Sequence, residues 1–172
     1  MRLSAFTDYS LRVLMYLGVN SGRLATVAEI AASFSLSKNH LMKVVHRLGC
    51  AAYIETVRGK GGGIRLARPP EQIKLGELIR YTETDLDLVE CFADGSNCRL
   101  QSACRLQHVL AEARQAMLTV LDNYTLASLL EQPVQLAHAL DLFAAAVPRC
   151  DPFAQQIPTD FPDESLSCPS IP

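Results

Sequence analysis

The sequence lacks a long hydrophobic run. Although 49% of its 172 residues are apolar, no uninterrupted stretch approaches the ~20 residues that a membrane-spanning helix needs. The first eight residues also lack the continuous apolar core of a secretory signal peptide. Both absences argue against a membrane protein or a secreted one, and we expect a soluble cytoplasmic protein. The apolar fraction, together with 20% charged residues, is typical of a packed globular chain.

Three kinds of catalytic or metal-binding motif are missing as well. The glycine-rich segment around residue 60 lacks the Gly-x-x-x-x-Gly-Lys-Ser/Thr pattern, so a phosphate-binding nucleotide loop is rejected. The cysteines do not form the Cys-x-x-Cys pairs of most zinc sites. No general base with an orienting partner accompanies any cysteine, which argues against a thiol enzyme.

Charge is distributed unevenly along the chain. Residues 1–80 carry twelve of the sixteen Lys and Arg but five of the eighteen Asp and Glu, a balance of +7. Residues 81–172 have a balance of −9. A basic first half joined to an acidic second half favours nucleic-acid contacts in the first half only. The alternative is an accidental distribution of solvated surface charge.

The first fifty residues have the pattern of three short helices. Apolar residues recur at helical spacing over residues 6–16. Thr26 and Glu29 have the spacing of a capping box that begins a second helix. We expect Ser37 to cap a third helix that runs to about Leu48. Two short helices joined by a tight turn form a helix-turn-helix.

The third helix is predicted to be amphipathic. Its apolar residues follow the i, i+3, i+4, i+7 pattern and are Leu41, Val44, Val45 and Leu48. The opposite face is polar and can donate hydrogen bonds to bases and phosphates, as a recognition helix must. An ordinary solvated helix face is the alternative. The residues of this segment that we expect to contact DNA are Ser37, Lys38, Asn39, His40, Lys43, His46 and Arg47.

A glycine-rich hairpin is predicted next. Two β-type segments, at 53–57 and 64–66, flank a run of glycines that contains Lys60. Small residues let the backbone approach phosphates, and neighbouring cations neutralise them. The expected DNA contacts of this segment are Arg58, Gly59, Lys60 and Arg65. A helix-turn-helix followed by such a hairpin is a winged helix, and a helix over about 75–83 follows it.

A long helix is predicted from about Ala103 to Tyr124. Its apolar residues are spaced alternately by four and three, as in a coiled coil, and they are Leu106, Leu110, Ala113, Met117, Val120 and Tyr124. This stripe suits a dimerisation helix. A helix that packs on its own domain is the alternative.

Three of the six cysteines are clustered. Cys91, Cys98 and Cys104 fall within fourteen residues, and in a reducing cytoplasm such clustering indicates a metal or redox site. Three soft thiolates fit an iron–sulfur cluster, whose cubane form needs a fourth ligand from elsewhere in the chain, from an exogenous molecule or from a carboxylate. Unligated thiols in a partly buried loop, or a structural zinc site, are the alternatives. We do not expect Cys50, Cys150 and Cys168 to bind iron.

The expected fold is mainly α, and the chain divides into three parts. Residues 1–80 are predicted to form a winged helix-turn-helix DNA-binding domain with a small β-hairpin wing. Residues 81–130 are predicted to hold the iron–sulfur loop and the long dimerisation helix. Residues 131–172 form an acidic, proline-rich tail that we expect to be partly disordered, with at most a weak helix over 134–146.

Several of these motifs occur together in one known family. They are Phe6-Thr7-Asp8-Tyr9, residues 39–43, residues 57–66, the three clustered cysteines and residues 121–126. In these motifs the chain resembles the NsrR family, the nitric-oxide-sensing repressors among the iron–sulfur winged-helix regulators. The resemblance covers roughly residues 1–130.

The resemblance implies a homodimer that binds double-stranded operator DNA and is not an enzyme. It implies an oxygen-labile cluster, [4Fe-4S] rather than [2Fe-2S], held by Cys91, Cys98 and Cys104 and by Asp8 of the partner subunit. Nitric oxide then nitrosylates the cluster, the DNA is released, and genes of the nitric-oxide-stress response are expressed. A second hypothesis in the same regulator class is a sensor of redox state or iron–sulfur supply with a [2Fe-2S] cluster.

Two features depart from related regulators. The related regulator of iron–sulfur assembly has a histidine three residues after its third cysteine, whereas Gln107 stands there and His108 follows. One residue rotates a helical side chain by ~100°, which disfavours His108 as a ligand. The long acidic tail also exceeds what the NsrR resemblance implies.

Overall fold

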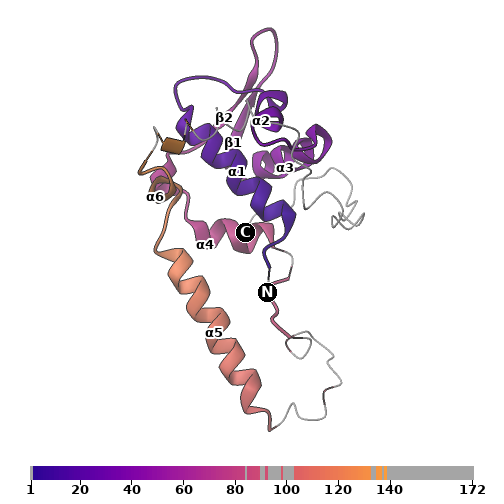
Figure 1. The fold of residues 1–172 in the computed structure, drawn as a ribbon, viewed down its shortest axis with the longest axis vertical. Helices are drawn as coiled ribbons and strands as arrows, with labels where there is room; N and C mark the ends of the chain where they lie inside the picture. Colours follow the sequence, from indigo (N-terminus) through magenta and orange to yellow (C-terminus); the bar gives the residue numbers. More distant parts are fainter. Residues whose placement is uncertain are drawn as a thin grey trace.

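Helices dominate the computed structural model, which describes residues 2–83, 85–89, 92, 98, 103–132, 135, 136 and 138. A two-stranded antiparallel hairpin accompanies them (Figure 1). This arrangement confirms the predicted fold class. The elements of the described part are α1 (Ala5–Val19), α2 (Val27–Ser33), α3 (Lys38–Cys50), β1 (Ile54–Val57), β2 (Gly63–Leu66), the 3-10 helix η1 (Pro70–Gln72), α4 (Leu75–Thr82), α5 (Arg105–Asp122) and α6 (Leu126–Leu129).

The N-termini of α2 and α3 test the two capping predictions. The predicted capping box of α2 is confirmed, since the Glu29 N–H donates to Thr26 Oγ1 over 3.1 Å and the Glu29 carboxylate accepts from the Thr26 N–H. At α3 the boundary is right, but the predicted side-chain cap is wrong because the Ser37 hydroxyl makes no capping hydrogen bond. The Ser37 backbone carbonyl accepts from the Leu41 N–H at 3.1 Å, which is the first hydrogen bond of the helix at any N-cap.

The hairpin is held to the body of the domain by a third segment. Its register pairs Ile54 with Leu66 and Val57 with Gly63. Ala25, just before α2, exchanges two backbone hydrogen bonds of 3.0 and 2.8 Å with Ile64. These bonds fix the base of the wing beside the helix-turn-helix.

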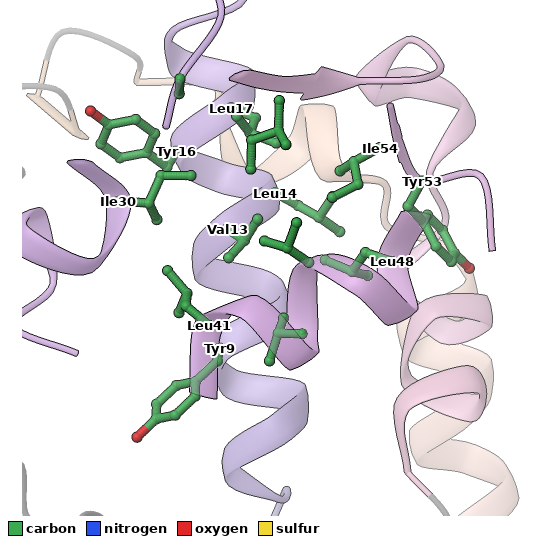
Figure 2. Packing of buried hydrophobic residues seen from close by; sticks show 14 of the residues in the cluster. Tyr9, Val13, Leu14, Tyr16, Leu17, Ile30, Leu41, Leu48, Tyr53 and Ile54 are labelled. Carbon is green, nitrogen blue, oxygen red and sulfur yellow. The ribbon is translucent and has the colours of Figure 1, made fainter. Parts of the chain in front are cut away.

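The core lies between α1 and α3. Figure 2 shows Val13 and Leu14 of α1 beside Leu48 of α3, and all three are fully buried. The four apolar residues predicted to face inward from α3 are all buried. Burial of such side chains contributes about 1.5–3 kcal/mol each, so this packing fixes the recognition helix against α1.

The long helix leaves the body of the domain, and the chain then returns to it. In Figure 1, α5 extends away from the other helices, at the end opposite the hairpin. After α5 ends, the Leu126 N–H donates to the Ile73 carbonyl over 2.8 Å, and the Leu126 side chain is fully buried in the core. Arg80 of α4 binds the carboxylate of Asp122 with two bonds of 2.7 and 2.6 Å. One end of α5 is therefore anchored to the winged helix.

Two other predictions concern membrane-spanning helices and the tail. No helix of the described residues combines the length and the apolar character required for a membrane span. Most of the predicted disordered tail over 131–172 and most of the predicted weak helix over 134–146 lie outside the described residues.

Candidate nucleic-acid interface and cysteine segment

The outward face of α3 is polar and accessible. Most of the residues predicted to contact DNA from this segment are exposed, namely Ser37, Lys38, Asn39, Lys43 and His46. His40 and Arg47 are half-buried. Met42, which the sequence reasoning did not select, is exposed on the same helix. A helix that is apolar inside and polar outside can enter the major groove of DNA with its outer face.

Arg47 is packed between aromatic rings. Its guanidinium lies 5.5 Å from the ring centroid of Phe6 and 5.7 Å from that of Tyr81. The Tyr81 hydroxyl also donates to the Arg47 backbone carbonyl at 2.9 Å. Arg47 thus joins the end of α3 to the start of α1 and to α4. Sequence periodicity places it on the polar face and gives no sign of these contacts.

The wing presents its cations to solvent. Arg58, Gly59 and Lys60 are exposed at the turn, where Gly59 and Gly61 adopt φ of 107° and 81°, a region that favours glycine. Arg65 is also exposed, and its guanidinium pairs with the carboxylate of Glu55 across the hairpin. The turn therefore combines an exposed glycine backbone with positive charge, as a phosphate contact requires.

Glu29 connects α2, the first helix of the helix-turn-helix, to α1. Its carboxylate accepts from the Tyr16 hydroxyl at 2.6 Å and pairs with the Arg23 guanidinium. The hydrogen bond from Arg23, followed by that from Tyr16, lowers the pKa of Glu29 to about 2 despite partial desolvation. Burial and the bond to Glu29 raise the pKa of Tyr16. These bonds connect α1, α2 and the turn between them.

Asp8 lies in the first turn of α1 but does not cap it. Ser4 is the N-cap, and its hydroxyl accepts from the Thr7 N–H at 3.2 Å. Asp8 Oδ2 lies 2.8 Å from an Arg12 guanidinium nitrogen. This oxygen is buried, and no donor in the described part of the chain meets it with hydrogen-bond geometry. The contact between the Arg12 guanidinium and Asp8 Oδ2 is therefore an ion pair whose geometry does not meet that of a hydrogen bond.

The start of α1 is joined to the end of α4. The Ser4 N–H donates to the Glu83 carboxylate over 2.8 Å. The buried Thr7 hydroxyl donates to Thr82 Oγ1 at 2.8 Å, and Thr82 in turn donates to the Leu78 carbonyl at 2.9 Å. The Ser4–Glu83 and Thr7–Thr82 bonds each span more than seventy residues of sequence, so no local pattern could have predicted them.

The clustered cysteines are described only in part. Cys98 is exposed, and Cys104 is half-buried at the N-cap position of α5, where its side chain makes no capping hydrogen bond. Cys91 lies outside the described residues, as do Cys150 and Cys168. Within the residues that are described, no three His, Cys, Asp or Glu side chains gather closely enough to hold a metal. Cys50 lies apart on α3, with its sulfur 3.7 Å from His46 Nε2.

Arg114 connects the segment around Cys91 to α5. Its guanidinium binds the Asp87 carboxylate at 2.5 Å and lies 4.9 Å from the ring centroid of Phe92. Asp87 precedes Cys91, and Phe92 follows it directly. Asp87 and Phe92 therefore both contact α5, the helix that follows Cys104.

Known proteins resemble this chain in sequence and in structure. The model of the Rrf2 family, described as an iron-dependent transcriptional regulator, matches residues 3–132. The transcriptional regulator NsrR of Bacillus subtilis is 49% identical over 83% of this chain and 99% of that protein. NsrR of Bacillus licheniformis is 54% identical over 73% of this chain and 90% of that protein.

Solved structures show the same fold. CymR of B. subtilis, described as a global cysteine regulator, superposes with a TM-score of 0.62 at 26% identity, over 75% of this chain and 95% of its own. IscR of T. potens gives a TM-score of 0.62 at 26% identity, over 76% of this chain and 87% of its own. The resemblance to NsrR is confirmed, and the relatives are regulators rather than enzymes. The chain belongs to the Rrf2 family of transcriptional regulators, as a DNA-binding repressor with a winged helix-turn-helix.

Proposed function

We propose that this protein is a cytoplasmic, homodimeric repressor that senses nitric oxide through an iron–sulfur cluster. The observation that carries the proposal is the family match over residues 3–132, which spans the three clustered cysteines, together with 49% identity to NsrR over most of the chain. When bound, such a cluster supplies iron that reacts with nitric oxide. The chain's own residues then have to hold the cluster and connect it to DNA binding.

Cys91, Cys98 and Cys104 are the proposed thiolate ligands. These ligands fit an iron–sulfur cluster, because three soft thiolates with one open position suit a [4Fe-4S] cluster better than a closed zinc site. Cys104 stands where the unpaired N–H groups of the first turn of α5 favour negative charge. The contacts of Arg114 with Asp87 and Phe92 support this assignment, since these two residues, one on each side of Cys91 in the sequence, contact the same helix.

Asp8 of the partner subunit is the proposed fourth ligand. Ser4 already caps α1, so the stability of that helix does not require Asp8 as a cap. The Asp8 side chain is 33% exposed, so it is accessible to a second subunit, whereas its buried Oδ2 has the charge contact with Arg12. Phe6, two residues away, packs on Arg47 at the end of the recognition helix. A displacement of Asp8 would therefore reach α3 through one side-chain contact.

Dimerisation is proposed along α5. Of the stripe residues, Leu106 is 62% exposed, Val120 is 55% exposed, and Tyr124, just beyond the end of α5, is 50% exposed. Leu110 and Met117 are half-buried, and Leu118 is the one buried residue of this helix. A helix that packed on its own domain would bury this stripe. Covering it with the same helix of a second copy would place two recognition helices on one DNA duplex, as paired half-sites require.

Duplex DNA is the proposed ligand of α3 and the wing. On α3 the proposed contacts are Ser37, Lys38, Asn39, His40, Lys43, His46 and Arg47, and on the wing they are Arg58, Gly59, Lys60 and Arg65. Phosphate contacts on the wing give affinity without sequence preference, whereas side chains of α3 read base edges.

The proposal is tested by the iron and sulfide content of protein purified without oxygen. We expect Cys91→Ala, Cys98→Ala and Cys104→Ala each to lose both elements, while the matched control Cys168→Ala retains them. Asp8→Ala should keep a cluster with an altered spectrum and an altered response to nitric oxide. A spectrum unchanged in Cys98→Ala would contradict the ligand assignment. A [2Fe-2S] spectrum in the wild type would favour the redox or supply sensor instead.

A further inference from the structure

One apolar side chain stands among the polar residues of the recognition helix. Met42 of α3 is 53% exposed. At 100° per residue it lies on the same side as Asn39 and His46, three residues before it and four after it. Both neighbours are exposed. The buried face of the helix is filled by other residues, so Met42 does not complete the core of the domain.

We propose that Met42 contacts the C5-methyl groups of thymine in the major groove and is a specificity-determining residue for DNA. This inference rests on the proposed DNA-binding role of α3. It goes further, because it assigns a base preference to a side chain that forms no hydrogen bond with a base.

The chemistry of the major groove supports this assignment. Thymine presents a methyl group there, and no other base does. An unbranched thioether side chain has no donor and is a poor acceptor, so it gains little from the edges of guanine, cytosine or adenine. It is also flexible enough to follow a methyl group over a range of positions. Contact with that methyl removes apolar surface of both partners from water.

Met42 lies on the helix face that is proposed to contact DNA. A single exposed apolar residue elsewhere on a protein surface carries no functional signal. On this helix, Asn39 can bind the edge of a neighbouring adenine, and Lys43 can neutralise a phosphate. Met42 lies between such residues and would be held against the base edges whenever they engage DNA.

The test begins with wild-type protein purified without oxygen and a library of randomised duplexes. Repeated selection gives the preferred site. Each thymine of that site is then replaced by deoxyuridine, which removes the methyl group and leaves the hydrogen-bonding edge intact. Affinities of wild type, Met42→Ala and the conservative control Met42→Leu are measured by fluorescence anisotropy at one fixed salt concentration.

We expect one deoxyuridine position in each half-site to weaken the wild type by about fourfold, the effect of one methyl group left in water. The same replacement should leave Met42→Ala unaffected, while Met42→Leu should retain the sensitivity. The inference is overturned if no thymine position affects the wild type, or if Met42→Ala is as sensitive as the wild type. Failure of the wild type to select any site would instead contradict the proposed function.

Discussion

Replacing Arg47 with alanine separates packing from DNA contact at the end of the recognition helix. In the structure its guanidinium contacts two rings, at 5.5 Å and 5.7 Å from their centroids. Each such contact at a partly exposed site contributes about 0.5–1 kcal/mol. We therefore expect Arg47→Ala to lower the free energy of unfolding by about 1–2 kcal/mol, a loss of about 2–8 °C in melting temperature for a chain of this size.

Thermal and urea unfolding, followed by circular dichroism, measure this loss. Arg47→Lys keeps the charge but lacks the planar guanidinium, so it should recover only part of the stability. In a double-mutant cycle with Tyr81→Leu, the two losses should fall short of additivity by about 0.5–1 kcal/mol. Tyr81→Phe is the control, because it removes only the hydroxyl bond to the Arg47 carbonyl.

Arg47 is also one of the proposed DNA contacts. If it reads a base edge, Arg47→Ala should change which sequences are preferred but leave the salt slope of binding unchanged, whereas loss of a phosphate contact would reduce that slope by about 1 per subunit. The packing argument is refuted if Arg47→Ala is as stable as the wild type and its salt slope falls. In that case the Arg47 guanidinium contacts DNA and does not stabilise the fold.

Three other predictions concern the wing, the dimer and the helix-turn-helix. Lys60→Ala should weaken binding to all sequences and flatten the salt slope by about 1 per subunit; an unchanged slope in a variant that also lacks Arg58 would show that the wing does not touch phosphate. Leu110→Glu places a charge at the proposed dimer seam, which should cost several kcal/mol, so sedimentation should show monomers; a folded dimer would contradict the seam. The pKa of Glu29 is lowered to about 2. Its contribution to the free energy of unfolding is therefore complete above its ordinary pKa of 4.5 and is lost as the pH falls through 2. Glu29→Gln should therefore show less loss of stability across that range in urea unfolding, and parallel curves for the two proteins would refute this linkage.

Much of the winged helix could be predicted from short-range patterns. The capping box at Thr26 and Glu29, the inward face of α3 and the glycine turn of the hairpin each depend on residues close together in sequence. Each was confirmed. The prediction for Ser37 is right in position but wrong in its side-chain bond, because a serine hydroxyl at an N-cap can rotate away from the N–H groups of the first turn.

The remaining contacts required the tertiary structure. Arg47 was selected for its charge, but its partners Phe6 and Tyr81 lie on two other helices. The Thr7–Thr82 bond and the burial of Leu126 connect segments far apart in the chain. Met42 is not predicted from the pattern, because a polar helix face indicates DNA contacts only through its polar residues. The cysteine spacing indicates a cluster, but spacing alone does not fix its geometry.

The most direct test of the central claim is a nitric oxide titration of protein purified without oxygen and bound to its selected DNA site. Visible absorbance reports the iron–sulfur cluster, and fluorescence anisotropy of labelled DNA reports binding in the same sample. We expect the iron–sulfur absorbance and the bound DNA to be lost together, and we expect Cys98→Ala to show neither the absorbance nor the nitric oxide response. A colourless wild-type protein, or one whose affinity for DNA is unchanged by nitric oxide, would contradict that claim.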